Sequence, residues 1–161
     1  MTIEATDGPR FLPVGLDVRG RRCLVVGGGA VGTRKSLTLA RAGASVTVVS
    51  PTVTDELTEL IDAGRIHWVR DAFRNAQVRG VFLAVAATDD AAHNAAVVQA
   101  AVDEGALVCD ASSVERSGVI FGALLEEDDV TIAVFTGGKD PSRARSTRDE
   151  IAKQRGGTAG P

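Results

Sequence analysis

The sequence predicts an α/β fold in which a doubly wound parallel sheet precedes a small C-terminal α+β unit. Up to about residue 110, apolar runs of strand length alternate with segments of helical pattern, which is typical of strand–helix–strand units. These runs are apolar throughout, as expected for strands that are buried on both faces. Beyond residue 117, two apolar runs follow each other too closely for a crossover helix, which indicates a separate hairpin or meander.

The composition is that of an ordinary globular protein and argues against several classes of function. The chain has 161 residues, 44% hydrophobic and 24% charged, enough for one domain with a small appendage. Its net charge of −3 gives no general case for nucleic-acid binding, and no apolar run reaches the length of a membrane span. The polar residues 1–7 do not resemble a signal peptide, and Cys23 and Cys109 are expected as buried thiols, which favours a reducing cytoplasm. His67 and His93 lack the spacing of a metal site.

The first segments of the chain lead to a strand at the centre of the sheet. We expect residues 1–10 to form a flexible tail. Residues 11–16 are expected to form an edge strand, because Pro13 cannot donate a hydrogen bond within a central ladder. After a turn, residues 22–26 form the predicted first central strand.

Closely spaced glycines follow this strand directly and begin the next helix. In the spacing Gly27-x-Gly29-x-x-Gly32, which matches the dinucleotide fingerprint, Gly27 permits the sharp turn off the strand. Gly29 lets a pyrophosphate approach the backbone, and Gly32 lets the helix pack closely on the strand. The helix N-terminus then offers N–H groups and a positive dipole to phosphates. Together with Gly28, this loop predicts the phosphate-binding turn of a Rossmann-like domain.

The helix after the glycines is expected over residues 30–42 and ends at Gly43. The residues expected to face the sheet are Val31, Leu37 and Ala40. Arg34 and Lys35 lie in its first turns, where cations oppose the helix dipole. They are either two solvated charges or the partners of a phosphate or carboxylate, and both interpretations stay open.

The predicted second strand, residues 45–49, ends without the acid that many dinucleotide-binding domains place there for the ribose hydroxyls. Ser50, Pro51 and Thr52 follow instead, so ribose recognition falls to the backbone, to Ser50 or to Thr52. Because no arginine follows directly either, the choice between NAD and NADP stays open. A helix is expected over residues 55–63.

The remaining strands complete a sheet edge that can hold a ligand. They are expected at residues 66–69, 81–86 and 106–109, with a partly helical connection over residues 70–79 and a helix over residues 91–104 capped by Asp89 or Asp90. The fourth strand ends in Ala87, Thr88 and Asp89, small or polar residues that let a dinucleotide lie across the carboxyl edge of the sheet. The fifth strand delivers Asp110 and Ser113 to the same edge.

The C-terminal unit is expected to contain strands at residues 118–123 and 130–136, joined by an acidic turn at residues 126–129. A mostly polar helix over residues 142–155 follows, with Asp140 as its N-cap. Basic residues outnumber acidic ones here, which indicates either a solvated helix face or an anion site at the helix start. That candidate anion site consists of Gly137, Gly138, Lys139 and Arg143. Residues 156–161 are expected to form a second flexible tail.

Four blocks of the sequence, at residues 22–35, 49–51, 86–90 and 136–145, carry a family resemblance. The first block places Arg34-Lys35 after the glycines, and the last contains the pair Gly137-Gly138. In this order, and over most of residues 11–155, the blocks resemble the precorrin-2 dehydrogenase family, whose members also form the N-terminal part of multifunctional sirohaem synthases.

The resemblance implies an enzyme that oxidises precorrin-2, a carboxylate-rich tetrapyrrole, to sirohydrochlorin with NAD⁺ as the acceptor. Some members of the family also insert ferrous iron. The resemblance implies an NAD-binding Rossmann domain at residues 11–116 and a unit at residues 117–155 that forms a homodimer and binds substrate. The implied NAD contacts are Ala30, Val31, Pro51 and Thr52. The implied substrate-binding residues are Ser113, Thr136, Gly137, Lys139, Arg143 and Arg145.

The chain departs from the family pattern at one catalytic position. The family usually has an aspartate shortly after the fifth strand, whereas this chain has Ser112 or Ser113 there, depending on the direction of alignment. Asp110 is the nearest carboxylate, and we expect it to take the catalytic role. Family members also usually continue into a helical domain that helps to cover the substrate, so a more open site or a covering partner is expected here.

Two further hypotheses stay open beside the dehydrogenase. The serines at residues 112–113 favour a sensor or carrier that binds a dinucleotide or tetrapyrrole without turnover. The third hypothesis is a metallochelatase without dehydrogenase activity, against which the lack of a His/Cys cluster argues.

Overall fold

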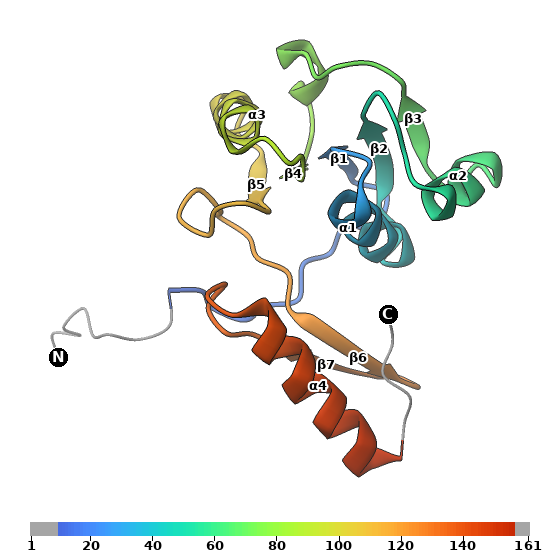
Figure 1. Cartoon of the computed structure of the whole chain (residues 1–161), viewed down its shortest axis with the longest axis vertical. Coiled ribbons are helices and arrows are strands. Elements are labelled where there is room, and N and C mark those ends of the chain that lie inside the picture. Colours follow the sequence, from blue (N-terminus) through green and yellow to red (C-terminus); the bar gives the residue numbers. More distant parts are fainter. Residues whose placement is uncertain (1–9, 157–161) are drawn as a thin grey trace, which may run out of the picture. The chain divides into compact units, whose positions relative to one another are not determined.

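The computed structural model describes residues 10–156, which form two compact units (Figure 1). One unit is Leu16–Val119, and the other combines residues 10–15 with residues 120–156. Residues 1–9 and 157–161, where most of the two expected tails fall, lie outside the described residues.

The larger unit contains a five-stranded sheet in the order β3-β2-β1-β4-β5, in which every neighbouring pair is parallel. Its elements are β1 (Arg22–Val26), α1 (Ala30–Arg41), β2 (Ser45–Val49), α2 (Asp55–Asp62), β3 (His67–Val69), the 3₁₀ helix η1 (Asn75–Val78), β4 (Leu83–Ala86), α3 (Ala91–Asp103) and β5 (Leu107–Asp110). The predicted doubly wound fold is confirmed. Because the strand order reverses beside β1, the carboxyl ends of β1 and β4 form the crevice where such sheets bind ligands.

Helices cover both faces of this sheet, and α1 and α3 lie on opposite sides of it (Figure 1). The α3 side contains an apolar cluster in which Val97, Val98 and Ala101 pack with sheet residues such as Leu24 and Val26. Burial on both faces explains why the strands are apolar throughout. The sheet therefore holds the loops at its carboxyl edge on a rigid base.

Both cysteines are buried free thiols in the sheet, as predicted. Burial raises the pKa of the Cys23 thiol to about 11. Burial also raises the pKa of Cys109, and the nearby Lys35 ammonium offsets only part of this effect. Neither thiol is therefore a nucleophile at neutral pH.

Two expectations for the N-terminal half are wrong. Residues 11–16 form no strand, and Leu12 and Val14 are strongly exposed, so this apolar stretch has no sheet neighbour to pair with. The face of α1 turned to the sheet is also different, because its buried residues are Gly32, Thr33, Ser36 and Leu39, whereas Val31 is exposed. The close approach of Gly32 to the glycine loop sets this rotation of the helix.

The smaller unit consists of the antiparallel hairpin β6 (Ala123–Glu127) and β7 (Val130–Val134), with α4 (Pro141–Arg155) packed against it. The predicted strand at residues 118–123 is wrong: the N–H groups of Gly118 and Val119 donate instead to the Val108 carbonyl oxygen. The predicted acidic turn is wrong in extent, because its two glutamates belong to β6 and only Asp128-Asp129 forms the turn.

Helix α4 begins as its sequence predicts. The Asp140 side chain accepts a hydrogen bond from the Arg143 N–H, with Pro141 as the first helical residue. Its buried positions are Ala144, Arg148 and Ala152, one turn apart along a single face. Gly156 ends the helix in the left-handed conformation.

Candidate functional site

In the glycine loop between β1 and α1, the fold requires three of the four glycines but not the fourth. Gly27 has a φ of +114°, and a Cβ there would overlap the Ala87 carbonyl. A Cβ at Gly28 would overlap the Thr52 carbonyl oxygen, and one at Gly32 would overlap the carbonyl of Gly27. At Gly29, by contrast, nothing lies within 4 Å of an added Cβ. The space above Gly29 is therefore open to a ligand.

Gly29 is also the N-cap of α1, with extended backbone angles and no side-chain cap. The first N–H groups of a helix have no acceptor within the helix, and here no side chain of the cap residue takes that place. No acidic residue lies in the first turn. A pyrophosphate would supply both the acceptors and the negative charge that this helix start favours. The residues present fit a dinucleotide.

The second wall of the crevice is the segment after β2, and hydrogen bonds tie it to the glycine loop. The Thr54 N–H donates to the Gly28 carbonyl oxygen at 3.1 Å, and the Thr54 and Thr33 hydroxyls lie 2.7 Å apart. The Trp68 indole N–H donates to the Ser50 carbonyl oxygen at 2.9 Å. These contacts hold the segment while leaving the neighbouring Pro51 and Thr52 exposed.

The third wall is the end of β4, where a fully buried asparagine organises the chain. Asn94 of α3 is 0% exposed. Its Oδ1 accepts hydrogen bonds from the Thr88 N–H at 3.0 Å and the Thr88 hydroxyl at 2.7 Å, and its Nδ2 donates to the Thr88 carbonyl oxygen at 3.0 Å. The same Nδ2 donates to Ser112 Oγ at 3.1 Å. Asn94 thus connects the loop after β4 with the loop after β5, and the sequence analysis missed it.

Asp110 lies at the end of β5 with a fully buried side chain. Its Oδ1 accepts from the Ser112 N–H at 2.8 Å and the Ser112 hydroxyl at 2.6 Å, and its Oδ2 accepts from Arg116 Nε at 2.6 Å. Burial alone would raise the pKa of this carboxyl, but the hydrogen bonds from Ser112 and Arg116 outweigh it and lower the pKa. Asp110 is therefore an anion held inside a loop.

Arg116, which closes this cluster, was also missed by the sequence analysis. It lies in the loop after β5, six residues beyond its partner, and its Nη2 is 3.3 Å from Ser112 Oγ. Ser113 lies in the same loop, where its Oγ accepts from the Arg116 N–H at 3.4 Å. A single arginine in a loop gives no sequence pattern from which an ion pair could be predicted.

Near the start of α1 the two candidate cations differ. Arg34 is exposed, whereas Lys35 is half-buried. Burial lowers the pKa of the Lys35 ammonium, although the nearby Cys109 opposes this shift. Lys35 therefore does not fit the interpretation of two solvated charges.

The predicted cofactor residues meet at one edge of the larger unit, whereas most predicted substrate residues belong to the smaller unit. At the start of α4, the Thr136 hydroxyl donates to the Asp140 carbonyl oxygen at 2.7 Å, and Gly137 and Gly138 both have positive φ. Lys139, Arg143 and Arg145 are exposed there.

Among the described residues no group of three or more His, Cys, Asp or Glu side chains could hold a metal ion. Within the same residues, no helix has the length and apolar character needed to cross a membrane.

The similarity to known proteins extends over both units of the chain. The family described as putative NAD(P)-binding matches residues 14–123. A siroheme synthase of Chromobacterium violaceum is 41% identical over 141 residues, and one of Nitrosococcus oceani is 37% identical over 142 residues. Each alignment covers 88% of this chain but only 30% of the relative, so the chain spans less than a third of their length.

A solved structure extends the similarity over most of another protein. The protein named SirC, precorrin-2 dehydrogenase, is 31% identical to this chain and superposes with a TM-score of 0.78. The match covers 89% of this chain and 71% of SirC, and therefore includes residues of the hairpin unit as well as the NAD(P)-binding sheet. The chain belongs to the NAD(P)-binding family of precorrin-2 dehydrogenases.

Proposed function

We propose that this protein oxidises precorrin-2 to sirohydrochlorin with NAD⁺ in the biosynthesis of sirohaem. The observation that carries the proposal is the match to SirC, which includes residues of the hairpin unit and so exceeds a generic dinucleotide-binding domain. The open space at Gly29 supports the cofactor half of the proposal. When bound, NAD⁺ supplies the hydride acceptor, and the substrate loses a hydride and a proton.

The proposed cofactor residues surround the crevice between β1 and β4. They are Gly27, Gly28, Gly29, Ala30, Val31, Gly32, Ser50, Pro51, Thr52, Ala87, Thr88 and Asp89. In this proposal the helix start at Gly29 binds the pyrophosphate, and the exposed Thr52 meets the ribose. Hydride transfer depends mainly on such positioning.

The proposed substrate residues carry positive charge that suits a carboxylate-rich tetrapyrrole. Lys139, Arg143 and Arg145 are exposed at the start of α4, and guanidinium groups bind carboxylates through two parallel hydrogen bonds. Thr136, Gly137 and Ser113 complete the set. Arg143→Gln should raise the KM for precorrin-2 and leave the affinity for NAD⁺ unchanged.

Asp110 remains the proposed catalytic carboxylate, and its surroundings define how the role is tested. Both of its oxygens accept hydrogen bonds and Arg116 pairs with Oδ2, so uptake of a proton has to work against this ion pair. Under anaerobic conditions, NADH and sirohydrochlorin are followed by absorbance for wild type, Asp110→Asn and the remote control Ser45→Ala. A fall in kcat of about 10²–10⁴-fold at unchanged NAD⁺ affinity supports a base. If kcat falls only because Asp110→Asn is less stable than wild type, the role of Asp110 is to hold the loop after β5 in place.

The ion pair between Asp110 and Arg116 also favours a second candidate function. A carboxylate tied to Arg116, in a loop that carries serines at residues 112–113, suits a protein that binds NAD⁺ or a tetrapyrrole without turnover. NAD⁺ binding without any NADH formation would select this sensor or carrier. Iron insertion without NADH formation would select a ferrochelatase, and iron insertion beside NADH formation a bifunctional enzyme.

We further propose that the protein is a cytoplasmic homodimer that assembles through the hairpin unit. Strands β6 and β7 pair only with each other among the described residues, and a two-stranded sheet is seldom stable alone. Light scattering coupled to gel filtration tests the proposal. A monomeric mass at micromolar concentration would contradict it.

A further inference from the structure

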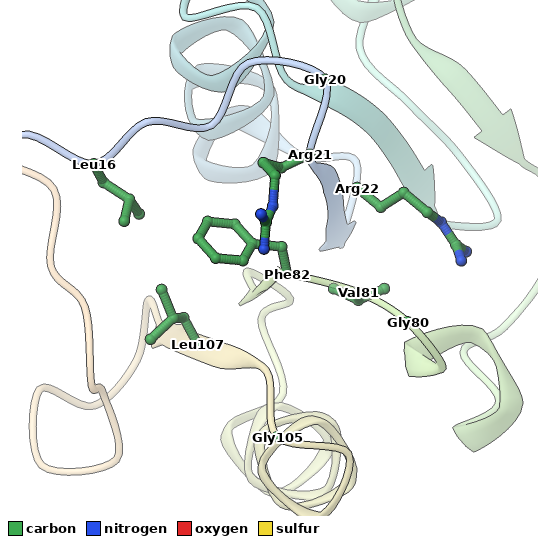
Figure 2. A pocket seen from close by; sticks show the side chains of 9 residues that line it. All are labelled: Leu16, Gly20, Arg21, Arg22, Gly80, Val81, Phe82, Gly105 and Leu107. Atoms are coloured by element: carbon green, nitrogen blue, oxygen red, sulfur yellow. The ribbon is translucent and has the colours of Figure 1, made fainter.

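A cavity of about 720 Å³ lies at the opposite edge of the sheet from the glycine loop, within the larger unit. Its walls are the residues just before or at the start of β1, β4 and β5 (Figure 2), namely Leu16, Gly20, Arg21, Arg22, Gly80, Val81, Phe82, Gly105 and Leu107. A five-residue strand such as β1 separates the two edges by about 16 Å. The cavity is therefore distinct from the cofactor crevice, and its volume is in the range of small-molecule sites.

One part of the cavity is apolar and open. The side chains of Leu16 and Leu107 lie on the same side as the ring of Phe82 (Figure 2). Leu16 is 40% exposed and Leu107 is 36% exposed, so both can still bury surface against a ligand. This part can bury a flat or branched apolar group.

The guanidinium of Arg21 lies over the Phe82 ring, with its central carbon 4.0 Å from the ring centroid. This contact fixes the guanidinium plane, and none of the described hydrogen bonds or ion pairs uses the Arg21 side chain. Because Arg21 is exposed, its donors can bind a ligand without first breaking an ion pair.

Charge around the cavity favours an anion. Arg22 points away from Arg21 in Figure 2, where its Nη1 donates to the Arg79 carbonyl oxygen at 3.1 Å. None of the nine lining residues is acidic. Arg19 binds the nearby Asp17 carboxylate through its guanidinium, at 2.9 and 2.7 Å, and through its backbone N–H, at 3.1 Å. The Arg21 guanidinium thus lies at the cavity, and no carboxylate is among the lining residues.

We propose that this cavity binds a small organic anion with an aromatic or branched apolar body and one carboxylate or phosphate group. The Arg21 guanidinium binds the anionic group, and Leu16, Phe82 and Leu107 cover the apolar body. A neutral ligand of the same shape lacks the ion pair, and an inorganic anion lacks the apolar contact. Both therefore bind more weakly than an amphipathic anion.

The test is an NMR titration of the whole chain with 2-naphthoate, observed at the amides of Gly20, Gly80 and Gly105. The matched probes are 2-naphthalenemethanol, which lacks the charge, and inorganic phosphate, which lacks the ring. We expect saturable shifts with 2-naphthoate and an affinity at least about tenfold lower for Arg21→Gln and for the alcohol. Arg65→Gln, an exposed arginine outside the cavity, should bind 2-naphthoate as wild type does.

The proposal would be overturned by shifts that do not saturate, by equal affinity of Arg21→Gln and wild type, or by equal affinity of the alcohol and the acid. Displacement of 2-naphthoate by NAD⁺ would likewise assign the probe to the cofactor crevice. Binding of NAD⁺ itself should be the same in Arg21→Gln and wild type, which separates this site from the proposed enzymatic function.

Discussion

The substitution Gly29→Asp should preserve the fold but weaken the binding of a dinucleotide. The backbone angles of Gly29 are those of an N-cap, where aspartate is favoured over glycine by a few tenths of a kcal/mol. Gly29→Asp should therefore leave the free energy of unfolding unchanged or slightly higher. Its carboxylate would occupy the proposed phosphate position and raise the Kd for NAD⁺ at least about tenfold.

Chemical denaturation and calorimetric titration measure the two effects separately. The matched control is Gly27→Ala, which should lower stability because the position has positive φ and its Cβ meets the Ala87 carbonyl. Unchanged NAD⁺ affinity in Gly29→Asp would remove the glycine loop from the cofactor site.

Asn94 supports a second prediction for a single residue, because its amide serves Thr88 and Ser112 together. Asn94→Leu keeps similar volume but removes the side-chain partner of the half-buried Thr88 N–H and carbonyl groups, whereas the Thr88 hydroxyl keeps its contact with Asp90. We expect a loss of about 1–3 kcal/mol for each group that stays unpaired, measured by urea unfolding. Asn94→Asp, which keeps the acceptor and loses the donor, should lie between this variant and wild type. Equal stability of Asn94→Leu and wild type would show that water replaces the amide.

The ion pair of Asp110 predicts a dependence of stability on pH. Its pKa is lowered in the folded protein from an ordinary value of 3.8, so the unfolded chain takes up the proton first as pH falls. The stability that Asp110 contributes is complete above that value and is lost as pH falls through the folded pKa. The difference in unfolding free energy between wild type and Asp110→Asn should accordingly shrink below about pH 4. A difference that stays constant down to pH 2 would contradict a lowered pKa.

At the scale of the element, the hairpin unit depends on one fully buried leucine. Leu125 of β6 is 1% exposed, whereas Val130 at the start of β7 is 46% exposed. Leu125→Ala should cost about 2–4 kcal/mol and speed hydrogen exchange in α4. Val130→Ala is the matched control and should change exchange little. If both variants behave alike, Leu125 does not anchor α4 to the hairpin.

For the whole molecule, bound NAD⁺ should stabilise the larger unit through its three crevice walls. At a free concentration of 100 times its Kd, a ligand that binds only the folded state adds about 2.7 kcal/mol. Hydrogen exchange should slow chiefly in residues 27–33, 50–54 and 87–94. Protection confined to residues 120–156 would instead place the nucleotide on the hairpin unit.

Local chemistry made much of this molecule predictable from its sequence. Strands β1 and β2 begin and end where expected, because an apolar run bounded by glycine or proline has few alternatives. The start of α4 was equally clear, since Asp140 and Pro141 cap a helix by themselves. The glycine spacing predicted the turn at Gly27 and the close packing at Gly32 for the same reason.

The sequence by itself thus determined the strand–helix alternation, the glycine loop and the capped last helix, all of which follow from contacts between near neighbours in the chain. Only the tertiary structure decided which face of α1 is buried and that residues 118–119 pair with β5 rather than with the hairpin. It also brought Asn94 to the loop after β5 and paired Arg116 of that loop with Asp110. These features depend on partners distant in sequence or in a loop without periodicity, so their energies appear only once the sheet has brought the segments together.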